Sequence, residues 1–298
     1  MRYYSLSEYF RKKYGKRLKK ICIDAGFSCP NRDGKVGLGG CIFCGERGAG
    51  EHIKHVSTIT EQVKAALAKA KDSDAFVAYF QNFTNTYAPT DVLKEKYDAA
   101  LIDERINVLA IATRPDCIDR ERARLIASYK QKLDVWVELG LQTADDEVGR
   151  IINRGYDTEA FVRAVEILGE YGIPTVAHVI IGLPHDSAEG VKKTVDFLSK
   201  MNLFGIKLHS IYVMRGTRLA ELYKSGQYTP PSEEEYLSLV TYAIRKMSTE
   251  TVFHRLTGDC PEGLLLAPEW NGRKMALIES IQKRLDAENV RQGELFDT

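Results

Sequence analysis

One stretch of this sequence reads Ile23-Asp-Ala-Gly-Phe-Ser-Cys29-Pro-Asn-Arg-Asp-Gly-Lys-Val-Gly-Leu-Gly-Gly-Cys41-Ile-Phe-Cys44 and holds three of the six cysteines in the 298-residue chain. Thiols in so glycine-rich a segment suit a metal better than a hydrophobic core. Iron–sulfur clusters are held by cysteine thiolates, and a protein that supplies three of the four ligands leaves one iron open to a small molecule. We therefore expect Cys29, Cys41 and Cys44 to hold such a cluster, with the chemistry at the open iron.

Zinc is the competing metal, because the Cys41 and Cys44 pair is followed by the pair His52 and His55. Zinc sites with this ligand set usually place about a dozen residues between the pairs and three to five between the histidines. Here the gaps are seven and two residues, and Cys29 goes unused. A zinc-bearing, non-catalytic nucleic-acid-binding module remains an alternative, and metal analysis with visible absorbance separates it from an iron–sulfur protein.

The amino terminus, Met-Arg-Tyr-Tyr-Ser, lacks the apolar run of a secretory signal. No stretch approaches the roughly 18 apolar residues of a membrane span. We therefore expect a cytoplasmic protein without membrane contact, whose thiols stay reduced and form no disulfide framework.

The charge is unevenly distributed, although the whole chain carries only +1. Residues 1–20 contain eight basic residues and one acidic residue, a net charge of +7, whereas the remainder holds 34 basic and 40 acidic residues, a net charge of −6. Such asymmetry suggests contact with a polyanion such as nucleic acid, and a solvated helix face is the alternative. The tyrosines and phenylalanine among these charges would serve either base stacking or packing onto the body.

Apolar runs of strand length alternate with helical periodicity, which favours a parallel sheet covered by helices. The expected strands are Lys20–Ala25, Ala75–Phe80, Asn107–Thr113, Asp134–Gly140, Pro174–Gly182 and Gly205–Met214, and the expected helices between them are Thr60–Lys71, Thr90–Asp103, Arg120–Tyr129, Thr158–Tyr171 and Ser187–Met201. Six such units form a partial or closed barrel, with the functional residues where strands end and loops begin.

The pattern changes beyond residue 214, where two further helices are expected over 232–249 and 273–288. The run Val252–Pro261 between them is too polar for a plain core strand, so we expect it to reach the mouth of the barrel. The chain then divides into a basic amino-terminal segment (1–19), a catalytic core (20–215) and a carboxy-terminal extension (216–298).

A first strand that runs directly into a three-cysteine loop at the top of a (βα)6 barrel resembles the radical S-adenosylmethionine (SAM) enzymes. In that superfamily the cysteines hold a [4Fe–4S] cluster, and the open iron binds the amino and carboxylate groups of SAM. The eleven residues between Cys29 and Cys41 make a loop longer than the familiar one. That loop resembles the Elp3-like radical SAM proteins, and its sequence resembles one bacterial family, typified by YhcC and YtqA. The resemblance implies an α/β fold, a partial (βα)6 TIM-like barrel with a small helical extension.

Several polar residues at expected strand ends are candidates for binding SAM. The resemblance assigns Gln81, after the second strand, to the SAM amino group and Gly182, after the fifth, to the adenine. Glu138 lies inside an apolar run, where an unpaired charge is costly, so it meets the SAM ribose and amino group or a cation, or forms an ion pair inside the barrel. Gln142 ends the same run and is assigned to the cofactor with it. Arg154 pairs with the SAM carboxylate or is exposed.

The substrate side is expected from the last two strands. Lys207 and His209 alternate with apolar residues, as does His178, so these side chains would point into the barrel or fill the core. With Arg215 they are the candidate catalytic residues. Further substrate or SAM contacts are Tyr212, Arg114 and Asp116, while Cys22, Cys117 and Cys260 are expected to be small core residues, with a radical-relay cysteine as the alternative.

The resemblance implies modification of the tRNA wobble uridine. A 5-carboxymethylaminomethyl group, on uridine or 2-thiouridine, would become aminomethyl through a 5′-deoxyadenosyl radical. The implied partners are the tRNA anticodon loop, a reductant such as flavodoxin or ferredoxin, and a downstream SAM-dependent methyltransferase. A radical SAM enzyme acting on a small metabolite or a peptide is the alternative within the superfamily.

Overall fold

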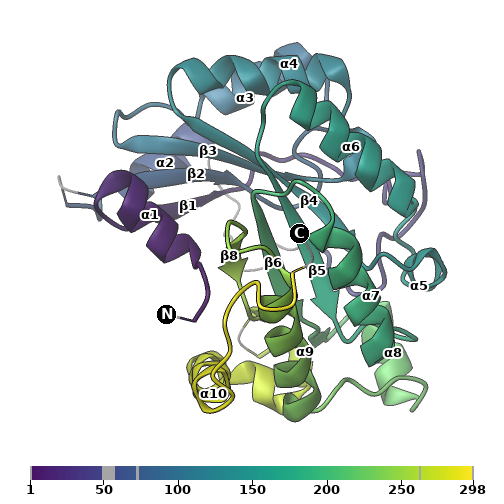
Figure 1. Cartoon of the computed structure of the whole chain (residues 1–298). Helices are drawn as coiled ribbons and strands as arrows, with labels where there is room; N and C mark the ends of the chain where they lie inside the picture. The colour runs from purple at the N-terminus through teal and green to yellow at the C-terminus, as the bar shows by residue number, and fades with distance from the viewer. Residues whose placement is uncertain (1, 49–57, 72–73, 262, 297–298) are drawn as a thin grey trace.

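A curled sheet of parallel strands forms the centre of the computed structural model, which describes residues 2–48, 58–71, 74–261 and 263–296 (Figure 1). The strands, in spatial order, are β1 (Lys19–Ile23), β2 (Phe76–Phe80), β3 (Ile106–Thr113), β4 (Asp134–Gln142), β5 (Thr175–Ile181), β6 (Gly205–Ser210) and β8 (Val252–Arg255). Each strand pairs in parallel with its neighbour in this order. The expected α/β partial barrel is confirmed, and five of the six expected strands match within two residues at each end.

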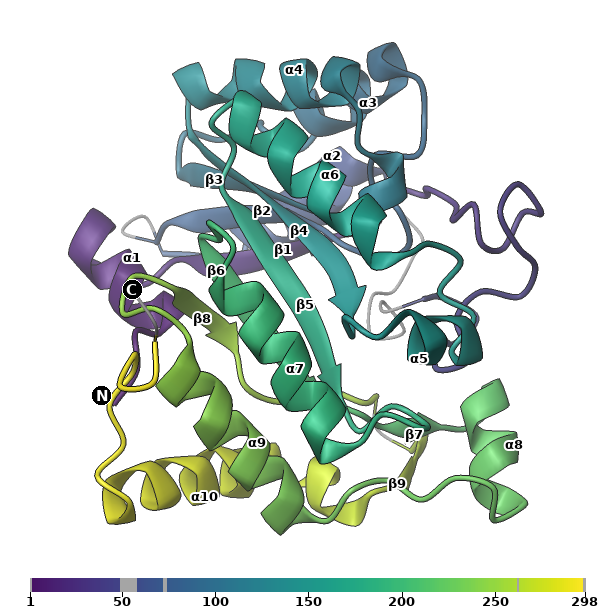
Figure 2. The same ribbon diagram turned by 45° about the vertical axis from the view of Figure 1, so that its right-hand side comes forward.

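Helices cover the outer, convex face of the sheet, and Figure 2 shows α6 and α7 lying along it. The helices of the described residues are α1 (Leu6–Tyr14), α2 (Ile59–Leu67), α3 (Thr90–Asp98), α4 (Arg120–Ser128), α5 (Asp146–Ile151), α6 (Thr158–Glu170), α7 (Ala188–Ser199), α8 (Arg218–Lys224), α9 (Glu233–Lys246) and α10 (Lys274–Ala287). Local sequence fixes many of their starts: Thr58 with Glu61 forms a capping box for α2, and Ser232 with Glu235 forms one for α9.

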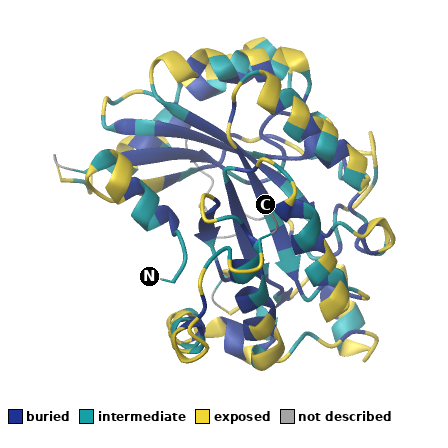
Figure 3. Cartoon of the chain, viewed as in Figure 1, coloured by how far each residue is buried: buried dark blue, intermediate teal, exposed yellow. Residues whose placement is uncertain are grey.

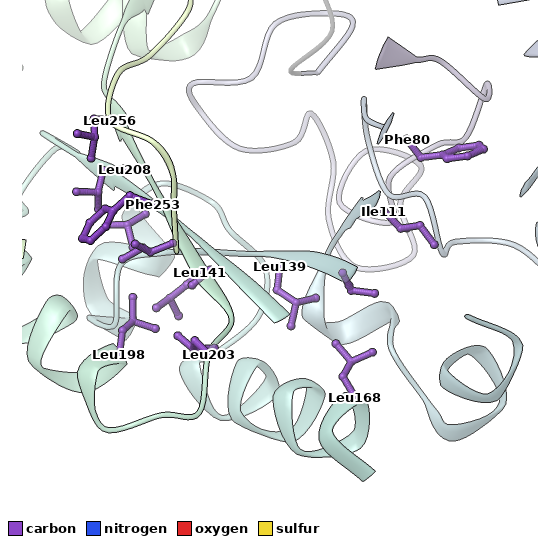
Figure 4. Close-up of a cluster of buried hydrophobic side chains, with 14 of the residues drawn as sticks. Phe80, Ile111, Leu139, Leu141, Leu168, Leu198, Leu203, Leu208, Phe253 and Leu256 are labelled. Atoms are coloured by element: carbon purple, nitrogen blue, oxygen red, sulfur yellow. The ribbon is translucent and has the colours of Figure 1, made fainter. Parts of the chain in front are cut away.

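The main hydrophobic core lies between the convex face and these helices. Alternate strand residues point outward into it, and Figure 4 shows Phe80, Ile111 and Leu139 from the sheet with Leu168 of α6. Figure 3 shows the strands buried and the outward sides of the helices exposed. The intervening strand residues therefore face the concave side, where the polar residues of the site gather.

Helix α1 packs its apolar side against the concave side, at the amino-terminal ends of the strands. Leu6 and Phe10 are buried there with Val77 and Trp136, and the ring of Tyr9 lies 5.0 Å from that of Phe204. The aromatic residues of the basic segment therefore pack onto the body, which was one of the two predicted roles. Its cations lie at the end of the sheet opposite the cysteine loop.

Strand β8 corrects the sequence prediction, since Val252–Arg255 forms a strand of the parallel sheet. The prediction was wrong because the whole run Val252–Pro261 was judged too polar for a core strand, whereas its first four residues form one. In the structure His254 is buried against Trp136 and Phe204, with ring centroids 5.4 and 5.3 Å apart. The strand also receives the amino terminus, because the Phe253 N–H donates to the Tyr4 carbonyl at 2.8 Å.

The sixth expected strand was too long. It ends at Ser210, and Val213–Met214 forms a separate strand, β7, antiparallel to β9 (Leu265–Ala267). Because β8 joins the sheet from beyond residue 215, the carboxy-terminal segment supplies the last strand of the partial barrel, and the predicted domain boundaries remain a prediction. Among the described residues, no helix has the length and apolarity needed to cross a membrane.

Candidate active site

The cysteine loop leaves the carboxyl end of β1 and is tied to the segment that follows β4. The Ile42 N–H donates to the Ile152 carbonyl at 3.0 Å, and the Asn31 side-chain amide donates to the Asn153 carbonyl at 2.6 Å. The same amide nitrogen lies 3.8 Å from the sulfur of Cys41. The loop thus lies at the end of the barrel where parallel strands present their functional residues.

All three loop cysteines are free and half-buried. The thiols of Cys41 and Cys44 share a hydrogen bond, which lowers the pKa of Cys41 and raises that of Cys44, and Cys29 acts electrostatically on Cys44. In the described ranges, no three His, Cys, Asp or Glu side chains lie close enough together to hold a metal ion. The fit to a three-thiolate cluster therefore rests on donor chemistry and on the shared loop, and the two histidines of the zinc alternative, His52 and His55, lie outside the described residues.

Glycines give the loop its path. Gly39 and Gly40 have φ of 77° and 78°, values that side chains rarely adopt. A Cβ on Gly37 would collide with the Asn31 side chain, the residue that anchors the loop. The glycines thus allow tight bends, and substitution there would shift the cysteines.

The polar run after β2 contains a residue that sequence reasoning missed. Gln81 was chosen for SAM and is half-buried, but its neighbour Asn82 is only 4% exposed and has a φ of 73°. Neither polar atom of the Asn82 side chain has a hydrogen-bond partner in the described residues. A buried amide without partners is costly, so Asn82 belongs with Gln81 among the candidate ligand contacts. The segment that holds Asn82 lies beside the cysteine loop, because the Thr84 N–H donates to the Ser28 carbonyl at 3.2 Å. Its position after a strand, next to that loop, was the signal that could have identified Asn82.

Arg154 is fully buried, so the predicted alternative of an exposed side chain is wrong. Its guanidinium donates to the carbonyls of Leu141, Thr143 and Tyr156 and pairs with Asp146 at 2.7 Å. These contacts hold the end of β4 in place. A SAM carboxylate contact from Arg154 remains a prediction.

Gln142 and Arg114 lie on either side of Tyr156. The Tyr156 hydroxyl donates to Gln142 Oε1 at 2.9 Å, and Gln142 has a φ of 64°. Arg114 lies over the Tyr156 ring, at 4.6 Å from its centroid, and donates two hydrogen bonds to Asp116, at 2.9 and 2.7 Å. Burial alone would lower the pKa of Arg114, but Asp116 outweighs it and raises that pKa. Arg114 and Asp116 therefore form one rigid unit beside the loop.

Gly182 has a φ of 100°, and a Cβ there would lie 2.6 Å from Pro231 and 2.7 Å from Ile211. The absence of a side chain lets these two segments approach the end of β5. Its predicted contact with adenine remains a prediction.

The concave face holds a buried polar network centred on Glu138. One carboxylate oxygen accepts hydrogen bonds from the Tyr79 hydroxyl at 2.9 Å, from His178 Nε2 at 2.8 Å and from the Lys207 ammonium, while the other accepts from Trp136 Nε1 at 3.0 Å. Glu138 thus forms the ion pair inside the barrel that was one of its predicted roles. Its SAM contact remains a prediction.

The electrostatics of this network follow from burial and from the ion pair. Burial alone would raise the pKa of Glu138, but Lys207 and His178 outweigh it and hold that pKa well below its usual range. Burial lowers the pKa of Lys207, against the effect of Glu138. Burial, with the neighbouring Lys207, also lowers the pKa of His178 to about 4, and burial holds that of His209 well below its usual range. The site therefore presents charged Glu138 and neutral histidines.

The three candidate catalytic residues do not come together. Lys207 and His209 face the concave side from β6, where the His209 ring lies 5.1 Å from that of His178. Arg215 is exposed after β7, where its backbone N–H donates to the Leu264 carbonyl at 2.9 Å. Lys207 and His209 thus share the concave face with Glu138, and Arg215 lies on a separate loop.

Known protein families and relatives match most of the chain. The Radical SAM superfamily model matches residues 29–198, and the Radical_SAM C-terminal domain model matches residues 204–287. The uncharacterized protein YtqA of Bacillus subtilis is 34% identical over 99% of this chain and 93% of its own length. The tRNA uridine(34) acetyltransferase of Methanocaldococcus infernus is 28% identical, over 63% of this chain and 34% of its own.

The solved structures show the same fold. The archaeal Methanocaldococcus infernus Elp3 with an N-terminal deletion superposes with a TM-score of 0.69 at 19% identity, covering 92% of this chain and 64% of that chain. The likeness supports the partial-barrel architecture described above.

Proposed function

This chain belongs to the radical SAM superfamily and, within it, to the family of YtqA and YhcC, and from that premise we propose that it modifies the wobble uridine of tRNA. The proposed reaction converts 5-carboxymethylaminomethyluridine, or its 2-thio form, to the 5-aminomethyl nucleoside. The observation that carries the proposal is the similarity to a tRNA uridine(34) acetyltransferase over 63% of the chain. The cationic concave face beneath the cysteine loop suits the acidic substituent of such a base.

Cys29, Cys41 and Cys44 would hold the [4Fe–4S] cluster of the superfamily. When bound, the cluster supplies the electron that cleaves SAM to methionine and a 5′-deoxyadenosyl radical, which removes a hydrogen atom from a C–H bond. Gln81 lies next to the loop, as does Asn82, whose side chain has no hydrogen-bond partner among the described residues, and both would orient SAM. The buried network around Glu138 would keep the lower part of the site rigid and free of bulk water.

The target is the CH2 group between the secondary amine and the carboxylate, because nitrogen stabilises a radical on the adjacent carbon. The carbon radical would then lose one electron, returned to the site that supplied it, and one proton to give an imine, which water hydrolyses. Overall, the substituent, SAM and water become the aminomethyl group, glyoxylate, methionine, 5′-deoxyadenosine and a proton, with SAM as the two-electron oxidant. A reductant such as flavodoxin or ferredoxin would feed the site, and a SAM-dependent methyltransferase would act on the amine that is released.

The test is anaerobic reconstitution with iron and sulfide, followed by reaction with dithionite, SAM and tRNA that carries the carboxymethylaminomethyl group. We expect 5′-deoxyadenosine, aminomethyluridine and glyoxylate in equal amounts from the wild type and none from Cys41→Ala. Deoxyadenosine formed without any change in the tRNA nucleosides would reject the tRNA substrate while keeping the radical chemistry. Small metabolites and peptides would then be the substrates to screen.

A further inference from the structure

Positive charge is in excess on the concave face. Lys20 of β1, Lys207 of β6 and Arg255 of β8 act electrostatically on one another, and Lys20 and Lys207 also act on Glu138, the acid of this group. Three basic side chains and this one carboxylate give a formal excess of two positive charges before Asp259, which is shared between Arg255 and Lys274, is counted. Of these three cations, only Lys207 forms a direct ion pair with Glu138 among the described residues, which leaves Lys20 and Arg255 able to bind another anion.

Lys20 has no anion of its own. In the part of the chain that the structure describes, its ammonium forms no ion pair and lies over the face of the Tyr79 ring, 5.2 Å from the centroid. Although the residue as a whole is exposed, partial loss of water around its ammonium lowers the pKa of Lys20, and Glu138 opposes that effect. A bound anion would stabilise the charged form.

A β-bulge directs Arg255 to the same face. Ile206 pairs with Phe253, but the next residue of β6, Lys207, pairs with Arg255, so His254 is the extra residue of β8. Without that extra residue, Arg255 would share the convex face of Phe253. The bulge instead sets two cations directly opposite each other on adjacent strands, a pairing that is unfavourable without an anion between them.

Asp259, the acid that contacts Arg255, lies farther from its guanidinium than from the Lys274 ammonium, with which it also pairs. Asp259 lies 3.4 Å from the Arg255 guanidinium but 2.7 Å from the Lys274 ammonium. Arg255 therefore retains donors for another carboxylate, and its planar guanidinium is suited to bind one with two parallel hydrogen bonds.

The cations can be reached from solvent and from the cysteine loop. Lys20 is exposed, and Cys22 and Arg255 are half-buried, although all three lie on the inner side of the sheet. The strands β1 and β8 are the two edges of the sheet, so no ladder closes the barrel between them. Lys20 lies three residues before Ile23, the end of β1, or about 10 Å below the start of the cysteine loop at 3.3 Å per residue.

We propose that Lys20 and Arg255, together with Lys207, form a carboxylate-binding site inside the barrel that anchors the acidic end of the substrate's C5 substituent. This assignment of the ligand rests on the proposed function. The carboxylate is bonded directly to the carbon that loses hydrogen, so anchoring the carboxylate fixes the reacting carbon relative to the cysteine loop. Lys20 and Arg255 are then binding residues for the reaction, in addition to those predicted from the sequence.

The first experiment uses a probe that does not depend on RNA. N-methylglycine reproduces the amine and carboxylate of the substituent, and its methyl ester lacks the negative charge. Binding of each to the reconstituted, SAM-loaded protein is measured by ligand-observed NMR titration. We compare the wild type with Lys20→Met, Arg255→Gln and the double variant, and use Lys19→Met as the matched control because Lys19 pairs with Asp74 at 2.6 Å and leaves the concave face unchanged.

We expect the wild type and Lys19→Met to bind the acid at least about tenfold more tightly than the ester, as one charge-assisted hydrogen bond would give. The double variant should bind the acid and the ester with equal affinity. Each single variant should show a preference for the acid that lies between those of the wild type and the double variant. Equal binding of acid and ester by the wild type would overturn the proposal. An unchanged preference in the double variant would do the same.

A second experiment separates this site from the proposed reaction. The variants are assayed on an anticodon stem–loop with the carboxymethylaminomethyl group, and we expect at least about a tenfold increase in KM for the double variant and none for Lys19→Met. If the wild type prefers N-methylglycine over its ester but leaves the RNA unchanged, the proposed reaction is wrong and the carboxylate site stands. If the RNA is converted with the same KM in every variant, the reaction stands and the site is wrong.

Discussion

The two ends of the parallel sheet are built differently. At the amino-terminal ends of the strands, α1 buries Leu6 and Phe10 against the concave face and so fills that end with apolar and aromatic side chains. At the carboxyl ends, the segment after β2 holds Asn82, Thr84 and Asn85, whose buried side chains carry polar atoms without partners in the described residues.

The backbone differs in the same way. Asn82, Phe83 and Gln142, all at carboxyl ends of strands, have positive φ, which is unfavourable for residues other than glycine. Unpaired polar atoms and strained residues each cost about 1–3 kcal/mol, so the packed end must supply stability that the other end lacks. The difference teaches that α1 serves stability and that the loop end serves ligand binding.

Removal of a loop thiol should have the largest effect on activity with the smallest effect on stability. Cys41→Ala should reduce 5′-deoxyadenosine formation to background, whereas the free energy of unfolding of the metal-free protein should change by less than about 1 kcal/mol. Product is measured by chromatography and stability by urea unfolding. Cys260→Ala, at a half-buried cysteine outside the loop, is the control and should keep its activity. Equal loss of product in Cys260→Ala would show that 5′-deoxyadenosine formation does not depend specifically on the loop thiols.

Phe10→Ala should give the opposite result. Phe10 is 3% exposed, and loss of its ring should lower the free energy of unfolding by about 3–5 kcal/mol. Deoxyadenosine formation per folded molecule should stay the same. Urea unfolding at constant pH measures the first effect, and Arg11→Ala, at an exposed position of the same helix, is the control. A fall in activity without a fall in stability would contradict the role given to α1.

The polar interior between the two ends should make stability depend on pH. The pKa of His178 is about 4 in the fold and about 6.5 when unfolded, so between these values the unfolded chain binds more protons. The stability that neutral His178 contributes is fully present above pH 6.5 and is lost as the pH falls toward 4, by up to about 3 kcal/mol. His178→Asn should flatten this dependence in urea unfolding across pH 7 to 4. An unchanged slope would show that His178 is protonated in the fold.

The smallest effect is expected from the cations of the amino-terminal segment. Alanine at Lys12, Lys13, Lys16 and Arg17 should weaken binding of full-length tRNA by about three- to tenfold at moderate salt and make it less salt-dependent. Binding of a short anticodon stem–loop should not change, because α1 lies at the end of the sheet remote from the cysteine loop. Filter binding at several salt concentrations measures both RNAs. Wild-type affinity for full-length tRNA would remove this segment from RNA binding.

The sheet and the cysteine loop could be predicted because their signals are local. Apolar runs mark the strands, and the spacing of Cys29, Cys41 and Cys44 suits a cluster whatever the surrounding contacts are. The ends of elements were less certain, as with the strand that stops at Ser210, because Val213 finds its partner about fifty residues later at Ala267.

The remaining site residues depend on contacts that the sequence does not contain. Asn82 stands out only because no described residue contacts its amide, and Arg154 is buried because three carbonyl groups turn toward it. The position of Arg255 depends on a bulge, and the polar side chain of His254 is accommodated in its strand by aromatic neighbours. Tertiary packing decides all of these, and a linear pattern cannot express it.

The attachment of the amino terminus to the far end of the chain has a consequence for biosynthesis. Phe253 donates to the Tyr4 carbonyl, and the Tyr4 N–H donates to the side chain of Gln292 at 2.6 Å. At about 5–20 residues per second, the ribosome makes the last of these partners roughly 15 to 60 s after the first. Helix α1 therefore emerges first and obtains its complete binding site last. Until then the segment before α1 lacks both of these hydrogen-bond partners, so its attachment must be a late step of folding on the ribosome.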